Sequence, residues 1–199
     1  MWVDIGCGVH VTKIKKGIKQ NFDKLDRVIR NRIPSGHHSH SKPQYAFNLE
    51  HVHAPVHRGA ALRSIGTLGG GNHFIEVNEG KDGIYLVIHS GSRILGKEIA
   101  DYHQEIAYQK LTDARQEIHA QLKAAGTSLE KQSLSDVLNE LEIPYEFSFV
   151  SENDLANYLA DMKIAQQYAA FNRQTMALKI LKAMKWEKQI IESFDSPHL

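Results

Sequence analysis

Short apolar runs that lie beside glycine-rich turns predict strands at three places along this chain. Residues 2–14 indicate a strand, a glycine turn and a second strand that contains Val9, Val11 and Ile14. The segments NHFIEV and GIYLVIHSGSR predict two paired strands, because the linker NEGKDG has the Asn, Asp and Gly of a hairpin loop. The run QIIESFDSPHL, which begins at Gln189, predicts a further strand that enters a turn.

Apolar residues at helical spacing predict several helices. They indicate an amphipathic helix over residues 15–33, a short helix near residues 60–62, and long helices from Leu95 to about Ala125 and from about Glu152 to Lys185. Residues 129–150 are mixed, with the β-prone run EFSFV. On the long helices we expect His103 and His119 at the surface and the following residues on the inner face of the second: Leu155, Leu159, Met162, Ala165, Ala169 and Met176. The pattern predicts an α+β fold in which mixed β-sheets are flanked by two long helices.

Composition narrows the class of protein. The chain has 199 residues, a net charge of +1 and 42% hydrophobic residues, which predicts a soluble globular protein with one core or slightly more. No apolar run approaches the ~20 residues of a membrane span, so we expect no membrane contact. A single cysteine cannot form an internal disulfide, which favours a reducing cytoplasm.

The predicted helix over residues 15–33 is basic. Seven lysines and arginines lie in it, beside two aspartates. Two interpretations stay open. The charges form a solvated face, or they form a surface that follows a phosphate backbone.

The stretch GTLGGGNHFIEV, residues 66–77, contains the densest set of candidate functional residues. Four glycines allow backbone amides to curl around an anion such as phosphate. Asn72 is a hydrogen-bond donor and acceptor, and His73 is a metal ligand or a proton carrier. The alternative is a glycine-rich turn that leads to a buried histidine.

A second candidate site lies near the beginning of the sequence. Asp4 and Cys7 are three residues apart across a glycine turn, so both side chains can point into one concavity. A thiolate and a carboxylate suit Zn²⁺ or Mn²⁺. Alternatively, Cys7 is a small buried hydrophobic residue.

The predicted hairpin brings two histidines together. An antiparallel register that places His73 opposite His89 puts both rings on one face with Ile75, Val77, Tyr85 and Val87, because side chains alternate with period 2. The hairpin is followed by HSGSR, in which Arg93 is a candidate phosphate-binding residue. The spacing GxSxG is absent, which excludes the nucleophile elbow of a serine hydrolase.

Several motifs, in this order, resemble the RtcB family of RNA-splicing ligases. They are DIGCG at residues 4–8, GGGNHFIEV at 69–77, HSGSR at 89–93 and LADMKIAQQYAAFNRQTM at 159–176. The resemblance covers almost the whole chain.

The resemblance implies a GTP- and Mn²⁺-dependent RNA ligase. Such enzymes join RNA ends that bear a 3′-phosphate or 2′,3′-cyclic phosphate, whether tRNA halves or broken RNAs, to 5′-hydroxyl ends. A histidine takes up GMP, passes it to the RNA 3′-phosphate, and the 5′-hydroxyl then displaces it. By resemblance, two Mn²⁺ ions, or Zn²⁺, have the ligands Asp4, Cys7, His73, His89 and His198, with Cys7 as the bridging thiolate. The resemblance also implies that Asn72 contacts the guanylate phosphate and that an accessory activator protein is possible.

The chain departs from the family pattern in several places. The segment before DIGCG and the C-terminal part with the guanylylated histidine are not present, so no catalytic nucleophile is assigned. Ile94 and Leu199 replace a usual Gly and a usual Asn. We therefore expect residues 1–199 to be one catalytic-core fragment that contains the metal-binding portion. Two alternatives stay open: a non-catalytic metal- or RNA-binding remnant, and a metal-dependent cyclic phosphoesterase.

Overall fold

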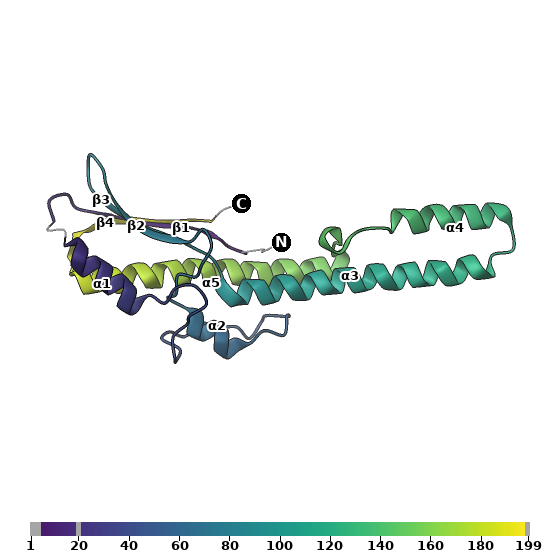
Figure 1. Cartoon of the computed structure of the whole chain (residues 1–199), viewed down its shortest axis with the longest axis horizontal. Coiled ribbons are helices and arrows are strands. Elements are labelled where there is room, and N and C mark those ends of the chain that lie inside the picture. The colour runs from purple at the N-terminus through teal and green to yellow at the C-terminus, as the bar shows by residue number, and fades with distance from the viewer. Residues whose placement is uncertain (1–4, 19–20, 198–199) are drawn as a thin grey trace.

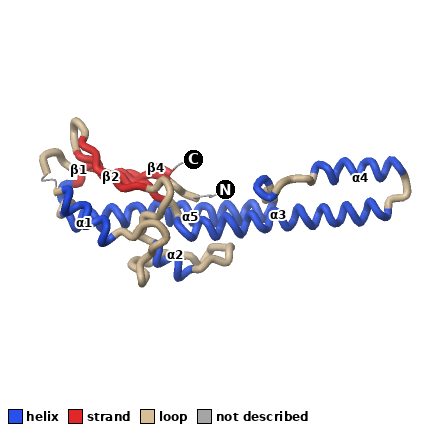
Figure 2. Tube along the Cα trace, viewed as in Figure 1, coloured by secondary structure: helices blue, strands red, loops and turns tan. Residues whose placement is uncertain are grey.

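The structure is a computed structural model that describes residues 5–18 and 21–197, and it has an α+β fold (Figures 1 and 2). The strands are β1 (Gly8–Ile14), β2 (Phe74–Glu79), β3 (Ile84–Ser90) and β4 (Ile190–Pro197). The helices are α1 (Phe22–Arg32), α2 (Arg58–Ser64), α3 (Arg93–Ala124), α4 (Ser128–Glu140) and α5 (Glu152–Met184). Two short 3₁₀ helices are η1 (Tyr145–Phe147) and η2 (Glu187–Gln189).

The strands form one sheet in the order β2-β3-β1-β4, and all three pairings are antiparallel. The prediction of mixed sheets was therefore wrong. Loop length accounts for the β2–β3 pairing, because a short loop can join only antiparallel strands. The one parallel contact is an isolated bridge between Ser35 and Gly69, outside the named strands of the described residues.

The register of the hairpin differs by one residue from the predicted one. Phe74, and not His73, lies opposite His89, and Ile75 lies opposite Ile88. A shift of one residue exchanges the two faces of a strand pair. Ile75 therefore lies on the core face with Leu86 and Ile88, while the outer face receives Tyr85, Val87 and His89.

Helix α5 crosses under the sheet and contributes buried residues to both core clusters (Figure 1). Its buried face begins at Asp161 and includes Ala165, Ala169 and Met176, as predicted. The first turns are different: Leu155 and Leu159 are 41% and 46% exposed, contrary to the prediction. In those turns Tyr158 faces the core instead, and its ring packs against the His103 ring of α3 with 5.2 Å between centroids.

Helix α1 is shorter than the predicted segment 15–33. It begins at Phe22 because the Asn21 side chain accepts a hydrogen bond from the Lys24 amide at 2.8 Å, which caps the first turn. Its apolar face packs through Leu25 and Ile33 against the end of α5.

The distal half of α3 and the whole of α4 form an arm that projects away from the sheet (Figure 1). No residue of α4 is buried, and the buried positions of α3 end at Ala107. Thr127 caps α4 by accepting from the Glu130 amide, and the Glu130 carboxylate accepts from Gly126. A Thr with a Glu three residues later is a sequence signal for a helix start at the edge of the segment that was predicted as mixed.

No helix among the residues that the structure describes has both the length and the apolar character that a bilayer crossing requires.

Candidate metal centre

The Cys7 thiol lies between two imidazole rings just before β1. Its Sγ is 3.0 Å from His89 Nε2 and 3.8 Å from His73 Nε2. The two rings are 5.4 Å apart between centroids and nearly perpendicular. Three potential metal donors from distant parts of the chain therefore lie next to one another.

Hydrogen bonds to the backbone determine the tautomer of both histidines. His73 Nδ1 lies 2.9 Å from the Leu68 carbonyl oxygen, and His89 Nδ1 lies 3.0 Å from the Asn72 carbonyl oxygen. A carbonyl can only accept, so each Nδ1 carries a proton and donates it. In the neutral rings the Nε2 lone pairs then point toward Cys7. Metal-binding histidines have this arrangement, with one nitrogen donating to a backbone carbonyl and the other available to the ion.

The two histidines reach this place in different ways. His89 projects from the outer face of β3, whereas His73 lies in the turn before β2 and is therefore outside the strand alternation. The predicted register was wrong, yet the rings still meet, because the turn and not the pleat sets the direction of His73.

The other two predicted ligands, Asp4 and His198, lie outside the described residues. Within residues 5–18 and 21–197, no group of three or more His, Cys, Asp and Glu side chains is arranged to hold a metal ion as it stands. A tetrahedral ion separates a sulfur and a nitrogen ligand by ~3.6 Å. The Cys7–His73 separation is close to that value, and the Cys7–His89 separation would have to lengthen by about half an ångström.

Glycine residues make room for the site on both sides of the thiol. Gly6 has φ of +77°, and a Cβ there would lie 2.9 Å from Gln166 Cα in α5. Gly69 has φ of +89°, and a Cβ there would lie 2.0 Å from Arg93 Nη1 and 2.8 Å from His73 Nδ1. A larger residue at Gly6 would push the segment that carries Cys7 away from α5, and a larger residue at Gly69 would displace Arg93 and His73.

Arg93, the predicted phosphate-binding residue, lies over the glycine turn. Its Nε donates to Thr67 Oγ1 at 3.3 Å, and its Nη2 donates to the Gly36 carbonyl at 3.1 Å. Its own φ is +58°, which is uncommon for a residue with a side chain. Asn72, the predicted nucleotide contact, is exposed in the same turn. Both functional roles stay predictions.

Arg173 in α5 supports the backbone on both sides of the thiol, and sequence reasoning missed it. This side chain is 1% exposed. Its Nη1 donates to the Gly6 carbonyl at 2.8 Å and to the Ser90 carbonyl at 2.7 Å, and its Nε donates to Asp195 at 2.8 Å. Gly6 precedes Cys7 and Ser90 follows His89, so one guanidinium holds the backbone beside two of the three donors.

The neighbouring Asn172 holds the glycine turn. Its Oδ1 accepts from the amides of Gly66 and Thr67 at 2.7 and 3.1 Å, and its Nδ2 donates to the Thr67 carbonyl at 3.1 Å. The signal in the sequence was the position of Asn172 and Arg173 between Ala169 and Met176, two residues predicted to lie on the inner face of the helix. A polar pair at this position in a buried helix has to be hydrogen-bonded.

The electrostatic environment of Asp195 follows from this network. Burial raises the pKa of Asp195, but the hydrogen bonds and charge of Arg173, together with His10 at 3.6 Å, outweigh it, and the pKa falls below its usual value. The carboxylate is therefore charged at neutral pH and pairs with the buried guanidinium.

A second buried carboxylate, Asp161, anchors the loop after residue 50. It accepts from the amides of His53 and Ala54 at 2.8 and 3.0 Å and from His103 Nε2 at 2.9 Å. His103 is 3% exposed, so its predicted position on the helix surface was wrong. Burial raises the pKa of Asp161, but the hydrogen bonds from His103, His53 and Ala54 together lower it further than burial raises it.

Comparison with known proteins gives the family of the chain. Residues 45–195 match the family model described as tRNA-splicing ligase RtcB, which is more than half of the sequence. The chain belongs to the RtcB family. The matched range contains His73, His89 and Arg93, whereas Cys7 lies before it.

Two curated RtcB proteins are similar to this chain over most of its length. The RNA-splicing ligase RtcB of Escherichia coli strain K12 is 24% identical over 208 residues, which cover 92% of this chain and 46% of that protein. The RNA-splicing ligase RtcB1 of Escherichia coli strain ATCC 25922 has the same identity and coverage. The chain thus spans about half the length of the curated RtcB relatives it matches. The resemblance deduced from the motifs is confirmed.

Proposed function

We propose that this protein is the metal-binding portion of an RtcB-type RNA ligase, or such a ligase itself. The reaction is the GTP- and Mn²⁺-dependent joining of RNA 3′-phosphate or 2′,3′-cyclic phosphate ends to 5′-hydroxyl ends. Family membership supports the class of reaction. The observation that carries the metal assignment is the approach of Cys7, His73 and His89 with both Nε2 lone pairs directed at the thiol.

The donor set fits a borderline divalent ion. A thiolate and two neutral imidazoles suit Zn²⁺ or Mn²⁺, and we propose Asp4 and His198 as the further ligands. Bound divalent ions would stabilise the negative charge that develops on phosphoryl oxygens during the transfer.

The residues of this chain have separate tasks in the proposal. The Leu68 and Asn72 carbonyls keep a proton on each Nδ1, so that the two Nε2 atoms remain donors. Arg173 keeps the backbone beside Cys7 and His89 in place. The exposed amide of Asn72 and the glycine turn around it are the proposed contacts for the guanylate phosphate, and Arg93 is proposed to contact a phosphate at the same turn.

Calorimetric titration with Mn²⁺ tests the metal assignment. We expect Cys7→Ala and His89→Ala each to weaken Mn²⁺ binding at least about tenfold, because each removes a ligand from the ion. His119→Ala is the control, because His119 is exposed on the arm. Wild-type Mn²⁺ affinity in Cys7→Ala would contradict the proposal.

A second experiment tests the reaction class. RNA that ends in a 2′,3′-cyclic phosphate is incubated with the protein and Mn²⁺, with and without GTP. Opening of the cyclic phosphate without GTP would contradict a GTP-dependent ligase and favour a phosphoesterase. Retention of label from GTP on the denatured chain would support the ligase.

A further inference from the structure

Basic residues gather at one end of the molecule. The chain as a whole has a net charge of +1, yet residues 15–33 carry seven lysines and arginines with two aspartates, and residues 182–189 carry three lysines with one glutamate. The arm has a net negative charge, since residues 108–150 carry four basic and seven acidic residues. We call the described part of residues 15–33 together with residues 182–189 the basic end.

The two segments of the basic end are neighbours in space. Helix α1 packs on the end of α5 through Leu25 and Ile33, which contribute to the same core cluster as Trp186. The Lys15 amide donates to the Gln189 carbonyl at 2.9 Å, which ties the turn after β1 to η2. Both segments therefore form one continuous surface.

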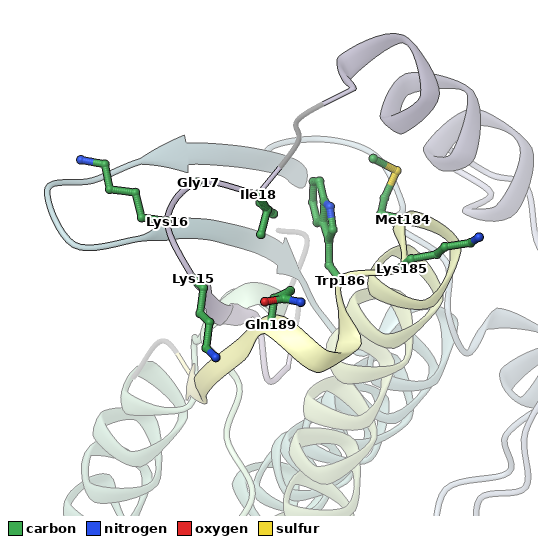
Figure 3. Close-up of a pocket in the computed structure, with 8 residues that line it drawn as sticks. All are labelled: Lys15, Lys16, Gly17, Ile18, Met184, Lys185, Trp186 and Gln189. Carbon is green, nitrogen blue, oxygen red and sulfur yellow. The ribbon is translucent and has the colours of Figure 1, made fainter.

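This surface contains a shallow pocket, open to solvent, of about 470 Å³ (Figure 3). Lys15, Lys16 and Lys185 line it, and Trp186, which is 4% exposed, closes its inner side. In Figure 3 the three lysine side chains extend outward in different directions and do not converge on one point. Spread ammonium groups suit an extended polyanion better than a single small anion.

The three lysines have no acidic partners among the residues that the structure describes. The ion pairs of nearby basic residues involve others: Lys13 pairs with Asp82, and Arg30 pairs with Asp26. The one hydrogen bond of Lys16 goes to the Lys81 carbonyl at 3.3 Å. The charges of the pocket rim are thus available to an external ligand.

Strand β1 connects the basic end to the candidate metal centre. Cys7 directly precedes β1 and Lys15 directly follows it. A strand rises ~3.3 Å per residue, so the two places are roughly 20–25 Å apart along this strand. A polynucleotide whose end lies near Cys7 would have to run several nucleotides further to reach the pocket.

We propose that the basic end binds the sugar-phosphate backbone of RNA several nucleotides away from the ends that are joined. This inference rests on the proposed function. A membrane surface is the less favourable ligand for the same charges. A basic helix binds membranes by inserting its apolar face, and in α1 the apolar residues Leu25, Val28 and Ile29 are packed on the core, which leaves Phe22 at its first turn too small a face for insertion.

Fluorescence anisotropy with a labelled single-stranded RNA of about 20 nucleotides tests the proposal. EDTA is present, so that the metal centre makes no contribution, and KCl is varied from 50 to 200 mM. The test variant is Lys15→Ala/Lys16→Ala/Lys185→Ala. The control variant is Lys123→Ala/Lys131→Ala/Lys163→Ala, which removes the same charge from three exposed lysines elsewhere.

For single strands, log K falls with log[salt] by ~0.7 for each phosphate contact. Loss of three contacts should therefore reduce the slope by about 2 and weaken binding on the order of 100-fold at 100 mM salt. The control should stay within about twofold of the wild type. Circular dichroism melting of each variant checks that it is folded.

Three results would overturn the proposal: an unchanged affinity in the test variant, an equal loss in both variants, or binding to phosphatidylserine vesicles without binding to RNA. Cys7→Ala should bind RNA as the wild type does in EDTA. The RNA-binding result therefore does not depend on the Mn²⁺ titration. Either proposal, metal binding at Cys7 or RNA binding at the basic end, can be disproved without affecting the other.

Discussion

Replacement of Arg173 should destabilise the protein and loosen the candidate metal centre at the same time. In Arg173→Met the carboxylate of Asp195, whose side chain is 15% exposed, loses its cationic partner. Loss of one member of a buried ion pair costs about 3–5 kcal/mol of unfolding free energy. The Gly6 and Ser90 carbonyls lose their donors as well. Arg173→Lys keeps the charge but not the planar fork, so we expect a smaller loss of about 1–3 kcal/mol.

Urea unfolding followed by circular dichroism measures these losses. Arg30→Met is the control, because Arg30 also pairs with an aspartate but is 76% exposed in its side chain. Exposed pairs contribute ~0–1 kcal/mol. In Arg173→Lys, Mn²⁺ affinity should fall although the protein remains folded, because the backbone beside Cys7 and His89 is less constrained. A loss below ~1 kcal/mol in Arg173→Met would refute the reasoning, because the buried pair would then contribute no more than an exposed one.

Two further substitutions test the turn and the buried carboxylate. Gly69→Ala should lower the free energy of unfolding by at least ~2 kcal/mol and weaken Mn²⁺ binding, because its Cβ would meet Arg93 and His73. Gly71→Ala is the control: Gly71 has φ of +73° but open space around it, so urea unfolding should show a loss of only ~1 kcal/mol. Asp161 has a lowered pKa in the folded state, so its contribution to stability is present above about pH 4 and is lost as pH falls through the folded pKa. The stability difference between wild type and Asp161→Asn should therefore shrink between pH 7 and pH 3, and a constant difference would contradict this.

The strongly periodic elements were predictable from the sequence. Helices α3 and α5 and strands β2, β3 and β4 lie close to where the apolar pattern placed them. Helix α4 was missed because it has no buried residue, so its apolar pattern is not shaped by a core. The failure at Leu155 and Leu159 has another cause: the helical period is present, but Tyr158, and not these two leucines, lies on the side that faces α3.

The site was only partly predictable, for a geometric reason. Residue types and spacing identified Cys7, His73 and His89, which lie close together. The register could not be obtained from spacing, because His73 lies in a turn whose path depends on Gly69 and on Asn172, which is far away in the sequence. Arg173 was interpreted as part of a scaffold helix. Only the fold shows that its guanidinium reaches the backbone beside two of the donors.

Because Arg173 holds the backbone beside Cys7 and His89, the candidate metal centre can form only late in the synthesis of the chain. Cys7, His73 and His89 are all synthesised long before the ribosome reaches Arg173, and β1 cannot acquire β4 as its neighbour until still later. Until then one edge of β1 has unpaired amide and carbonyl groups, which can pair with strands of other chains and lead to aggregation. Pairings between residues so distant in sequence also form slowly. During synthesis Cys7, His73 and His89 are therefore present before the Arg173 guanidinium that holds the backbone beside them in the folded protein.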